Sequence, residues 1–258
     1  MKTALPSPLP PTQVHAIKHA LAPYLRREKQ GRNDFKGYES ERGDALLAKG
    51  LVFAEIAAHP LVLDVCEHTP GPKFMLSACL AINSHPGENA QLLHFDDCFY
   101  RVPRPRPAYG VSAFWVIDEF SAENGAIEII PRCQTWGGDE VAGARYTENF
   151  VNGKHVRVVN HPDLDKVIMP AGSLMLAPGT RWHRGGPNRS QCSRLAITPR
   201  YCVAWGRQME TMLLDVPPDI PARYPERVHQ VLGYSNHPPF KGHVNGMHPM
   251  RVLKEVRP

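Results

Sequence analysis

His94 and Asp96 are separated by a single residue in the segment LLHFDD. The segment is a short, largely apolar run that predicts a strand, in which side chains alternate between faces. We therefore expect both residues to project to the same side, about 6 to 7 Å apart along the backbone. A neutral imidazole and a carboxylate suit iron(II), and a second histidine would complete a triad with three open coordination positions. By itself a His-x-Asp pair is common by chance and usually marks a surface or a satisfied core pair.

The second histidine has to be found among the 13 in the chain. Proline directly follows five of them and pushes them toward extended turn conformations: His59, His85, His161, His237 and His248. His183 differs, because it follows the apolar run MPAGSLMLAP and lies in the segment WHRGG. We expect His183 to complete the metal site.

Arg194 follows His183 by eleven residues and opens the apolar run RLAIT. A guanidinium group binds a carboxylate through two parallel hydrogen bonds and stays charged at any relevant pH. We expect Arg194 to hold the distal carboxylate of 2-oxoglutarate while the 2-oxo acid end chelates iron. Strand alternation would place Ala196 and Thr198 on the same face and leave room for a ligand. Alone, the arginine indicates a structural ion pair; the ordered set of four residues carries the hypothesis.

Two helices are predicted ahead of the strand-rich part of the chain. The first covers residues 12–29, with Thr12 as its N-cap and apolar residues on one face: Val14, Ile17, Leu21, Tyr24 and Leu25. The second covers residues 44–57, with Asp44 as its cap and three residues directed inward: Leu47, Leu51 and Ile56.

From about residue 73 the pattern changes to short apolar or alternating runs, separated by Gly, Pro and Asn, that are typical of strands. The runs are KFMLSACLAI, AQLLHFDD, YGVSAFWVID, GAIEIIP, KHVRVV, KVIMPAGSLMLAP and SRLAITPRYCVAW. Seven or eight such strands after helices predict a mainly β fold with flanking helices, a double-sheet sandwich or jelly roll. We expect one domain over 1–258, with helices at about 12–58, a core at about 73–205 and an extended, turn-rich tail at 206–258.

Composition argues against several classes of protein. The formal charge is +5, and the basic residues are scattered, whereas a nucleic-acid-binding protein concentrates them on one face. No run approaches the ~20 apolar residues of a membrane span, and prolines interrupt MKTALPSPLPPTQ where a signal peptide would need an apolar stretch. The six cysteines are dispersed without a CxxC pair. We expect no nucleic-acid or membrane partner and a reduced, cytoplasmic setting.

These motifs together resemble the phytanoyl-CoA dioxygenase family of iron(II) and 2-oxoglutarate oxygenases, especially its short microbial members from secondary metabolism. The resemblance runs from about Phe74 to Trp205 and continues into the tail. Its markers are AQLLHFDD, WVIDEFSAENGAIEIIP, MPAGSLMLAPGTRWHRGGPNRS and the arginine of SRLAIT. It implies a double-stranded β-helix core of the jelly-roll, cupin-like type. It also implies iron on His94, Asp96 and His183, and 2-oxoglutarate on Arg194.

The same resemblance implies further contacts around 2-oxoglutarate. Gln91, three residues before the first ligand, would belong to this shell, although strand alternation turns it away unless a bulge or strong twist intervenes. Trp115 would border the cosubstrate or be an ordinary buried aromatic. Relatives commonly carry a threonine that can touch 2-oxoglutarate where this chain has Ile127. Either the affinity for the cosubstrate is then lower, or another donor such as Thr198 takes over. The segment from Pro131 to Gln134 also departs from the usual Pro-Gly-Ser-His and would recast the pocket wall.

The family chemistry implies that O2 and 2-oxoglutarate are consumed while a substrate C–H bond is oxidised, with succinate and CO2 as coproducts. Hydroxylation is the outcome we expect; Asp96 argues against halogenation, and desaturation, epoxidation and rearrangement stay open. The substrate pocket should lie over the open side of the metal, roofed by residues 99–110 and 136–166, with the tail as a further candidate. Its candidate contacts are Phe99, Tyr100, Trp136 and Arg181.

A free small natural product or carboxylic acid is favoured as substrate over an acyl-CoA, because no phosphate-binding cluster is evident. A homodimer is also expected, since short members of the family often pair through loops near the pocket. Two other classes stay open. A catalytically silent β-sandwich that binds a metabolite or a protein partner is suggested by Ile127 and the altered turn. A zinc hydrolase could use the same triad, but Arg194 argues against it.

Overall fold

A computed structural model describes residues 4–5, 7–25, 33, 35–137, 145–151 and 154–255. The strands, all antiparallel, are β1 (Ala4–Leu5), β2 (Ser40–Gly43), β3 (Met75–Ser84), β4 (Gly110–Val116), β5 (Ile127–Ile129), β6 (Arg145–Val151), β7 (Lys154–Asn160), β8 (Asp165–Lys166), β9 (Leu174–Pro178), β10 (His183–Gly185) and β11 (Arg194–Cys202). The helices are α1 (Pro11–Leu21), α2 (Leu51–Ala57), α3 (Pro60–His68), α4 (Met212–Asp215), α5 (Glu226–Leu232) and α6 (Met250–Glu255). Four short 3-10 helices accompany them: η1 (Leu46–Ala48), η2 (Asp96–Phe99), η3 (Cys133–Thr135) and η4 (Pro221–Arg223).

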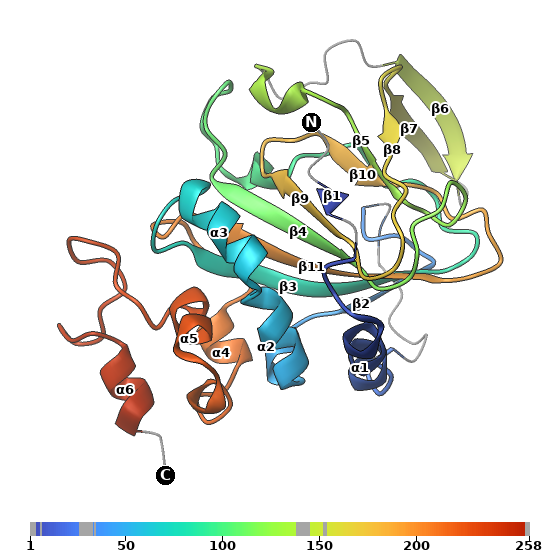
Figure 1. Cartoon of the computed structure of the whole chain (residues 1–258). Coiled ribbons are helices and arrows are strands. Elements are labelled where there is room, and N and C mark those ends of the chain that lie inside the picture. Colours follow the sequence, from blue (N-terminus) through green and yellow to red (C-terminus); the bar gives the residue numbers. More distant parts are fainter. Residues whose placement is uncertain are drawn as a thin grey trace.

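Two sheets form the jelly-roll core (Figure 1). The larger sheet has the order β1-β9-β4-β11-β3-β2, and the smaller one has the order β10-β5-β8. The hairpin β6-β7 forms a separate two-stranded sheet beside them. The prediction of a mainly β, jelly-roll fold with flanking helices is confirmed.

Strand alternation divides the interior into two layers. On β4, Ala113 and Trp115 point to the helix side of the larger sheet, in an outer core shared with the helices. Phe114 and Val116 point the other way, into an inner core between the two sheets. Because side chains in a strand alternate with period two, one strand supplies both layers.

Helices cover the outer face of the larger sheet. In Figure 1, α3 and α2 follow one another along it, and α1, which contacts α2, lies to one side. Ile17 of α1, Phe53 of α2 and Val62 of α3 are fully buried in the outer core. Each such side chain contributes roughly 1.5–3 kcal/mol through removal of apolar surface from water. The helices thus cover one face of the larger sheet, and its other face turns toward the inner core.

The first predicted helix exists with shifted ends. It begins at Pro11, so Thr12 is not its cap, and no side chain caps it. Proline is well suited to the first helical position, because its missing N–H would have had no partner there. Ile17 and Leu21, on the predicted apolar face, are fully buried, whereas Tyr24 follows the end of the helix and is 45% exposed. Residues 26–29 lie outside the described ranges.

The second predicted helix, over residues 44–57, is wrong in extent. The backbone of Ala45 is left-handed, η1 follows, and α2 starts only after Gly50, so Asp44 caps neither element. Leu47 and Ile56 are buried as predicted, but Leu51 is half exposed because it sits at the first position of α2. The predicted apolar residues are divided between two elements, with Leu47 on η1 and with Leu51 and Ile56 on α2. The strand β2 and the helix α3 were not predicted.

The tail was predicted as extended over 206–258, and this is corrected by three helices, α4, α5 and α6. The tail carries enough apolar residues to dock: Met212, Val228, Val231 and Leu232 are buried in the outer core. Residues 237–249 do follow the predicted turn-rich course, with two isolated bridges.

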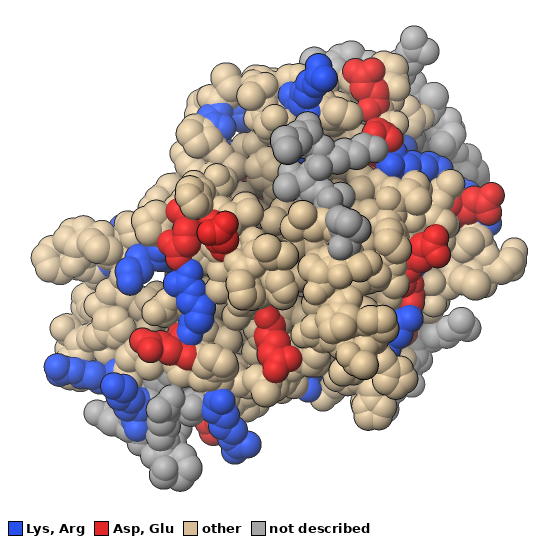
Figure 2. Space-filling model, viewed as in Figure 1, with Lys and Arg blue, Asp and Glu red and all other residues tan. Residues whose placement is uncertain are grey.

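The surface view in Figure 2 shows basic and acidic side chains interspersed over the visible face. The scatter expected from the sequence is thus seen on this face, and the absence of a nucleic-acid partner stays a prediction. Within the described ranges, no helix combines the length and the apolar character that a membrane crossing requires.

Candidate metal centre

His94 and His183 lie opposite each other across an antiparallel bridge. The amide of His94 donates to the carbonyl of His183 at 3.0 Å, and the reverse bond measures 2.9 Å. Their side chains therefore leave the backbone on the same face, and the imidazole centroids are 4.5 Å apart. His183 opens β10, which pairs with β5, so the smaller sheet positions both rings.

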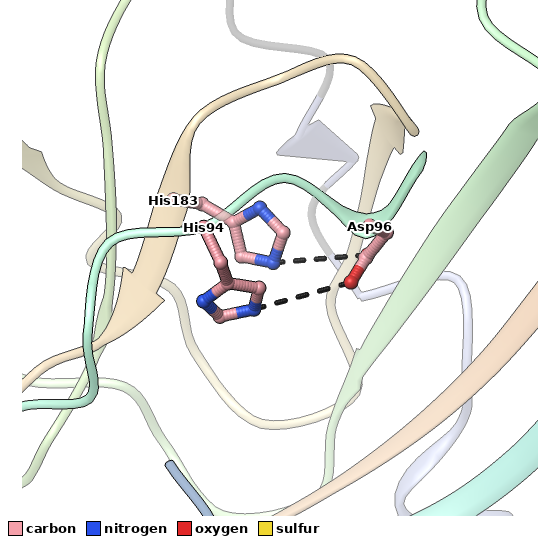
Figure 3. Close-up of side chains that lie close together, drawn as sticks. All are labelled: His94, Asp96 and His183. Carbon is pink, nitrogen blue, oxygen red and sulfur yellow. Dashed lines mark ion pairs between the residues drawn. The ribbon is translucent and has the colours of Figure 1, made fainter. Parts of the chain in front are cut away.

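The predicted strand at LLHFDD is wrong, because only His94 pairs and Asp96 already begins η2. Phe95 keeps an extended backbone between them, and this still brings both side chains to one side. The Nε2 atom of His94 lies 3.9 Å from Oδ1 of Asp96, and Nε2 of His183 lies 3.7 Å from Oδ2 (Figure 3). One ion with ligand distances of about 2.0–2.2 Å could bridge such separations.

Both histidines are oriented through their other ring nitrogen. Nδ1 of His94 is 2.8 Å from the carbonyl oxygen of Leu92, and Nδ1 of His183 is 3.0 Å from that of Arg181. When Nδ1–H donates to a carbonyl, the Nε2 lone pair is left for a metal. Burial, together with the neighbouring His183, lowers the pKa of His94 to about 3 and keeps that ring neutral.

Asp96 is held as a carboxylate by its neighbours. Burial alone would raise its pKa, but several neighbours together outweigh that effect, and the largest of their contributions comes from the charge of Arg200, whose Nη1 lies 3.0 Å from Oδ1. The two histidines and the Ser112 hydroxyl, which donates to Oδ2 at 2.5 Å, lower the pKa of Asp96 further. The Nε2 atom of His94 and the carboxylate of Asp96 are therefore in the protonation states that metal binding requires.

A pocket between the sheets begins at the two histidines, and we call it the inner pocket. Its walls include His94, His183, Gln91, Phe114, Ile127, Arg194, Ala196, Thr198 and Arg200. The last four of these occupy alternate positions of β11, so that the pattern predicted for Arg194, Ala196 and Thr198 runs on to Arg200. One face of one strand thus lines the pocket along its length.

Arg194 is buried in the inner pocket. Two contacts fix its position. Its Nη2 donates a hydrogen bond of 2.5 Å to the carbonyl oxygen of Gly125, and its guanidinium carbon lies 4.9 Å from the centre of the Phe120 ring. Its Nε has no hydrogen-bond partner among the described residues. Burial lowers the pKa of Arg194 to about 10, and the charge of Asp118 offsets part of this effect. The group therefore stays cationic at neutral pH. It is a buried cation able to receive a carboxylate.

The other predicted cosubstrate contacts have different positions. Gln91 lines the inner pocket, where its side chain accepts a 2.9 Å bond from the Gly185 amide and donates a 2.7 Å bond to Phe35. Its segment is irregular, so strict strand alternation does not apply there. Thr198 and Ile127 also line the pocket, whereas Trp115 lies in the outer core and contacts neither pocket described here.

A second pocket of about 380 Å³ opens on the Asp96 side of the triad, and we call it the outer pocket. The predicted substrate residues Phe99 and Tyr100 line it, together with Ser112, Arg200, Trp205 and Met209. Trp136 instead packs against a small cluster around Trp182, and Arg181 lines neither pocket. Of the predicted roof, residues 138–144 and 152–153 lie outside the described ranges.

Two residues of the site, Arg200 and Ser112, were not predicted. They are direct partners in the register of β11 and β4. A signal for Arg200 existed, since it continues the alternate positions that begin at Arg194. Ser112 carried no comparable signal, because it is one hydroxyl within an apolar run.

The fold and the triad define a jelly-roll protein with a two-histidine, one-carboxylate metal site. The chain belongs to the family described as "Phytanoyl-CoA dioxygenase (PhyH)", whose sequence profile matches residues 3–196.

Among curated proteins, the dioxygenase andF of Emericella variicolor is 25% identical over 143 residues, covering 53% of this chain and 45% of that protein. The dioxygenase aneA of Aspergillus aculeatus is 31% identical over 144 residues, covering 53% and 44% respectively. The chain spans about half the length of the curated relatives it matches.

Solved structures share the fold. HygX from Streptomyces hygroscopicus, crystallised with nickel, 2-oxoglutarate and hygromycin B, superposes with a TM-score of 0.59 at 14% identity, covering 80% of this chain and 84% of HygX. The epimerase SnoN, in complex with Fe3+, alpha ketoglutarate and nogalamycin RO, gives a TM-score of 0.58 at 15% identity, covering 79% and 80%.

Proposed function

We propose that this protein is an iron(II)- and 2-oxoglutarate-dependent dioxygenase that hydroxylates a C–H bond of a small natural product or carboxylic acid. The observation that carries the proposal is the triad of His94, Asp96 and His183 beside a pocket that contains the buried Arg194. Family membership and the curated relatives named dioxygenases support the same class of reaction.

The residues fit iron(II). Two imidazoles and one carboxylate converge on a common point, and their ligand atoms lie within 4.8 Å of one another. Such a facial set leaves coordination positions for other ligands. Bound together, iron and 2-oxoglutarate would supply oxidising chemistry in which one O2 oxygen enters the product hydroxyl, the other enters succinate, and CO2 leaves.

The chain's own residues then have distinct tasks. Arg194 would bind the distal carboxylate of 2-oxoglutarate, since no carboxylate of the described residues lies within hydrogen-bonding distance of its buried guanidinium and its Nε is unsatisfied there. Ala196 leaves space between Arg194 and the histidines, and Phe114 and Ile127 exclude water from the pocket. Leu92 and Arg181 hold the imidazoles through their carbonyl oxygens.

A test combines oxygen uptake with succinate release in the presence of iron(II), 2-oxoglutarate and a panel of small natural products. Succinate formed in equal amount to hydroxylated product, and only with oxygen present, is the expected result. A zinc hydrolase would act without oxygen and ignore 2-oxoglutarate. A silent binding protein would release no succinate with any substrate, and His183→Ala supplies the matched background.

Three further expectations belong to this proposal. We infer a single domain, because α1, α2 and the tail helix α5 share one outer core with the larger sheet. A reducing, cytoplasmic compartment fits six cysteines that are all free thiols. A homodimer is the expected assembly, and light scattering of the purified chain tests it.

A further inference from the structure

The triad separates the two pockets. His94 and His183 line the inner pocket, whereas Asp96 lines the outer pocket. Arg200 lines both and lies 3.0 Å from Asp96, so it stands where the two pockets meet. If 2-oxoglutarate extends from the histidines toward Arg194, as the proposed function requires, the outer pocket is the space left for a substrate.

Arg200 is a largely buried cation with an unsatisfied hydrogen-bond donor. Its side chain is 11% exposed, and its Nε has no hydrogen-bond partner within the described residues. An unsatisfied buried donor on a charged group is costly, so such a group is usually kept for a ligand or a water. With Asp96 engaged by a metal, the guanidinium would be still freer to bind another anion.

The charges around the outer pocket favour an anionic ligand. Two carboxylates line it, but Asp96 belongs to the triad and Asp97 is paired with Arg106 at 3.1 Å. Arg200 on the inside and the exposed Arg207 at the rim then leave the pocket with excess positive charge.

The rest of the outer pocket suits an apolar body. Phe99, Trp205 and Met209 line it and are each about half exposed or more, which is unusual for large apolar side chains. Trp205 also packs edge-on against Tyr100 and Tyr109. A mainly apolar pocket with a few convergent polar groups is the usual form of a small-molecule site.

We propose that the outer pocket binds the substrate, that the substrate is an amphipathic carboxylic acid, and that Arg200 holds its carboxylate. This inference rests on the proposed function for the position of 2-oxoglutarate. It assigns Arg200 a role in substrate specificity, and it narrows the substrate class from any small natural product to one with an apolar body and an acidic group.

Binding of 2-naphthoate and of its neutral analogue 2-naphthamide tests the proposal. The protein is loaded with nickel(II), which does not turn over, and with saturating 2-oxoglutarate, and each probe is titrated by fluorescence. Wild type should bind naphthoate roughly tenfold more tightly than naphthamide. Arg200→Gln should remove that preference, and Arg200→Lys should keep part of it. Arg251→Gln, at an exposed position of α6 that lines neither pocket, should leave it unchanged. Naphthamide affinity serves as the folding control for each variant.

Equal affinity of wild type for both probes, or no binding of either, would overturn the proposal. So would naphthoate affinity that falls as 2-oxoglutarate is raised, because the probe would then occupy the Arg194 site. If Arg200→Gln weakens 2-oxoglutarate and leaves naphthoate unchanged, the carboxylate held by Arg200 belongs to the cosubstrate instead. Failure of the proposed function itself would appear separately, as an absence of 2-oxoglutarate binding by the nickel-loaded wild type.

Discussion

The Ser112 hydroxyl donates to Oδ2 of Asp96 at 2.5 Å, from a strand that no metal ligand occupies. It fixes the rotation of the carboxylate, which otherwise sits at the start of a short 3-10 helix. Ser112→Ala should weaken nickel(II) binding about tenfold, because groups that orient a metal ligand affect affinity on this scale. Calorimetric titration measures it. Ser77→Ala is the matched control, since Ser77 also lines the outer pocket but its hydroxyl accepts a hydrogen bond from the Met209 amide. Equal effects of both variants on nickel(II) affinity would refute the role of Ser112.

Arg194 should govern 2-oxoglutarate affinity. Arg194→Ala removes the buried cation from the inner pocket, and we expect the Kd of 2-oxoglutarate for nickel-loaded protein to rise on the order of a hundredfold. The exposed Arg101 is the control, and Arg101→Ala should leave that Kd unchanged. A change of less than twofold in the Arg194 variant would show that 2-oxoglutarate does not use this residue.

Ile127 offers a test of the departure from the family pattern. Ile127→Thr should lower the Kd of 2-oxoglutarate roughly three- to tenfold through a new hydroxyl donor in the inner pocket. It should also cost about 1–2 kcal/mol of stability, because a buried methyl contact is lost. Ile129→Thr is matched, since Ile129 is equally buried at 4% but lies outside the pocket. It should lose stability alone; an unchanged Kd in both variants would disprove the expectation.

Glu210 should make stability depend on pH. Burial, with a smaller contribution from the charge of Asp44, raises the pKa of this carboxyl to about 7 from an ordinary 4.5. The fold therefore favours the protonated form. Its stability contribution is complete below pH 4.5 and is lost as pH rises to 7, by about 2–3 kcal/mol.

Urea unfolding between pH 4 and 8 measures this dependence. Glu210→Gln cannot ionise, so its free energy of unfolding should fall less over that range than the wild-type value. Glu123→Gln alters an exposed carboxyl and should retain the wild-type slope. Parallel curves for wild type and Glu210→Gln would contradict the assignment.

Much of the fold could be predicted because strands show a local pattern of short apolar or alternating runs. The strands β4, β5, β9 and β11 fall within predicted runs, and β3 and β7 overlap theirs and extend beyond them by two residues and one residue. The tail helices could not be predicted in the same way, since they are four to seven residues long. Packing in the outer core stabilises such short helices more than their own propensity does.

The site shows the same division. Alternation along β11 placed Arg194, Ala196 and Thr198 correctly on one face. The same rule correctly predicted that His94 and Asp96 lie on one side. Its premise was wrong, because Asp96 lies on a 3-10 helix and not on a strand. The pairing of Ser112 with Asp96 spans 16 positions and depends on how two segments cross, which no local pattern records.

Under the proposed function, His94, Asp96 and His183 hold iron(II), to which 2-oxoglutarate binds as a chelate. Anaerobic addition of iron(II) and then 2-oxoglutarate should produce the weak visible charge-transfer absorption of such a chelate. The band should be absent in His183→Ala and should require more 2-oxoglutarate in Arg194→Ala. A wild-type protein that binds both reagents at saturation and shows no band, or a band that persists unchanged in His183→Ala, would contradict the account.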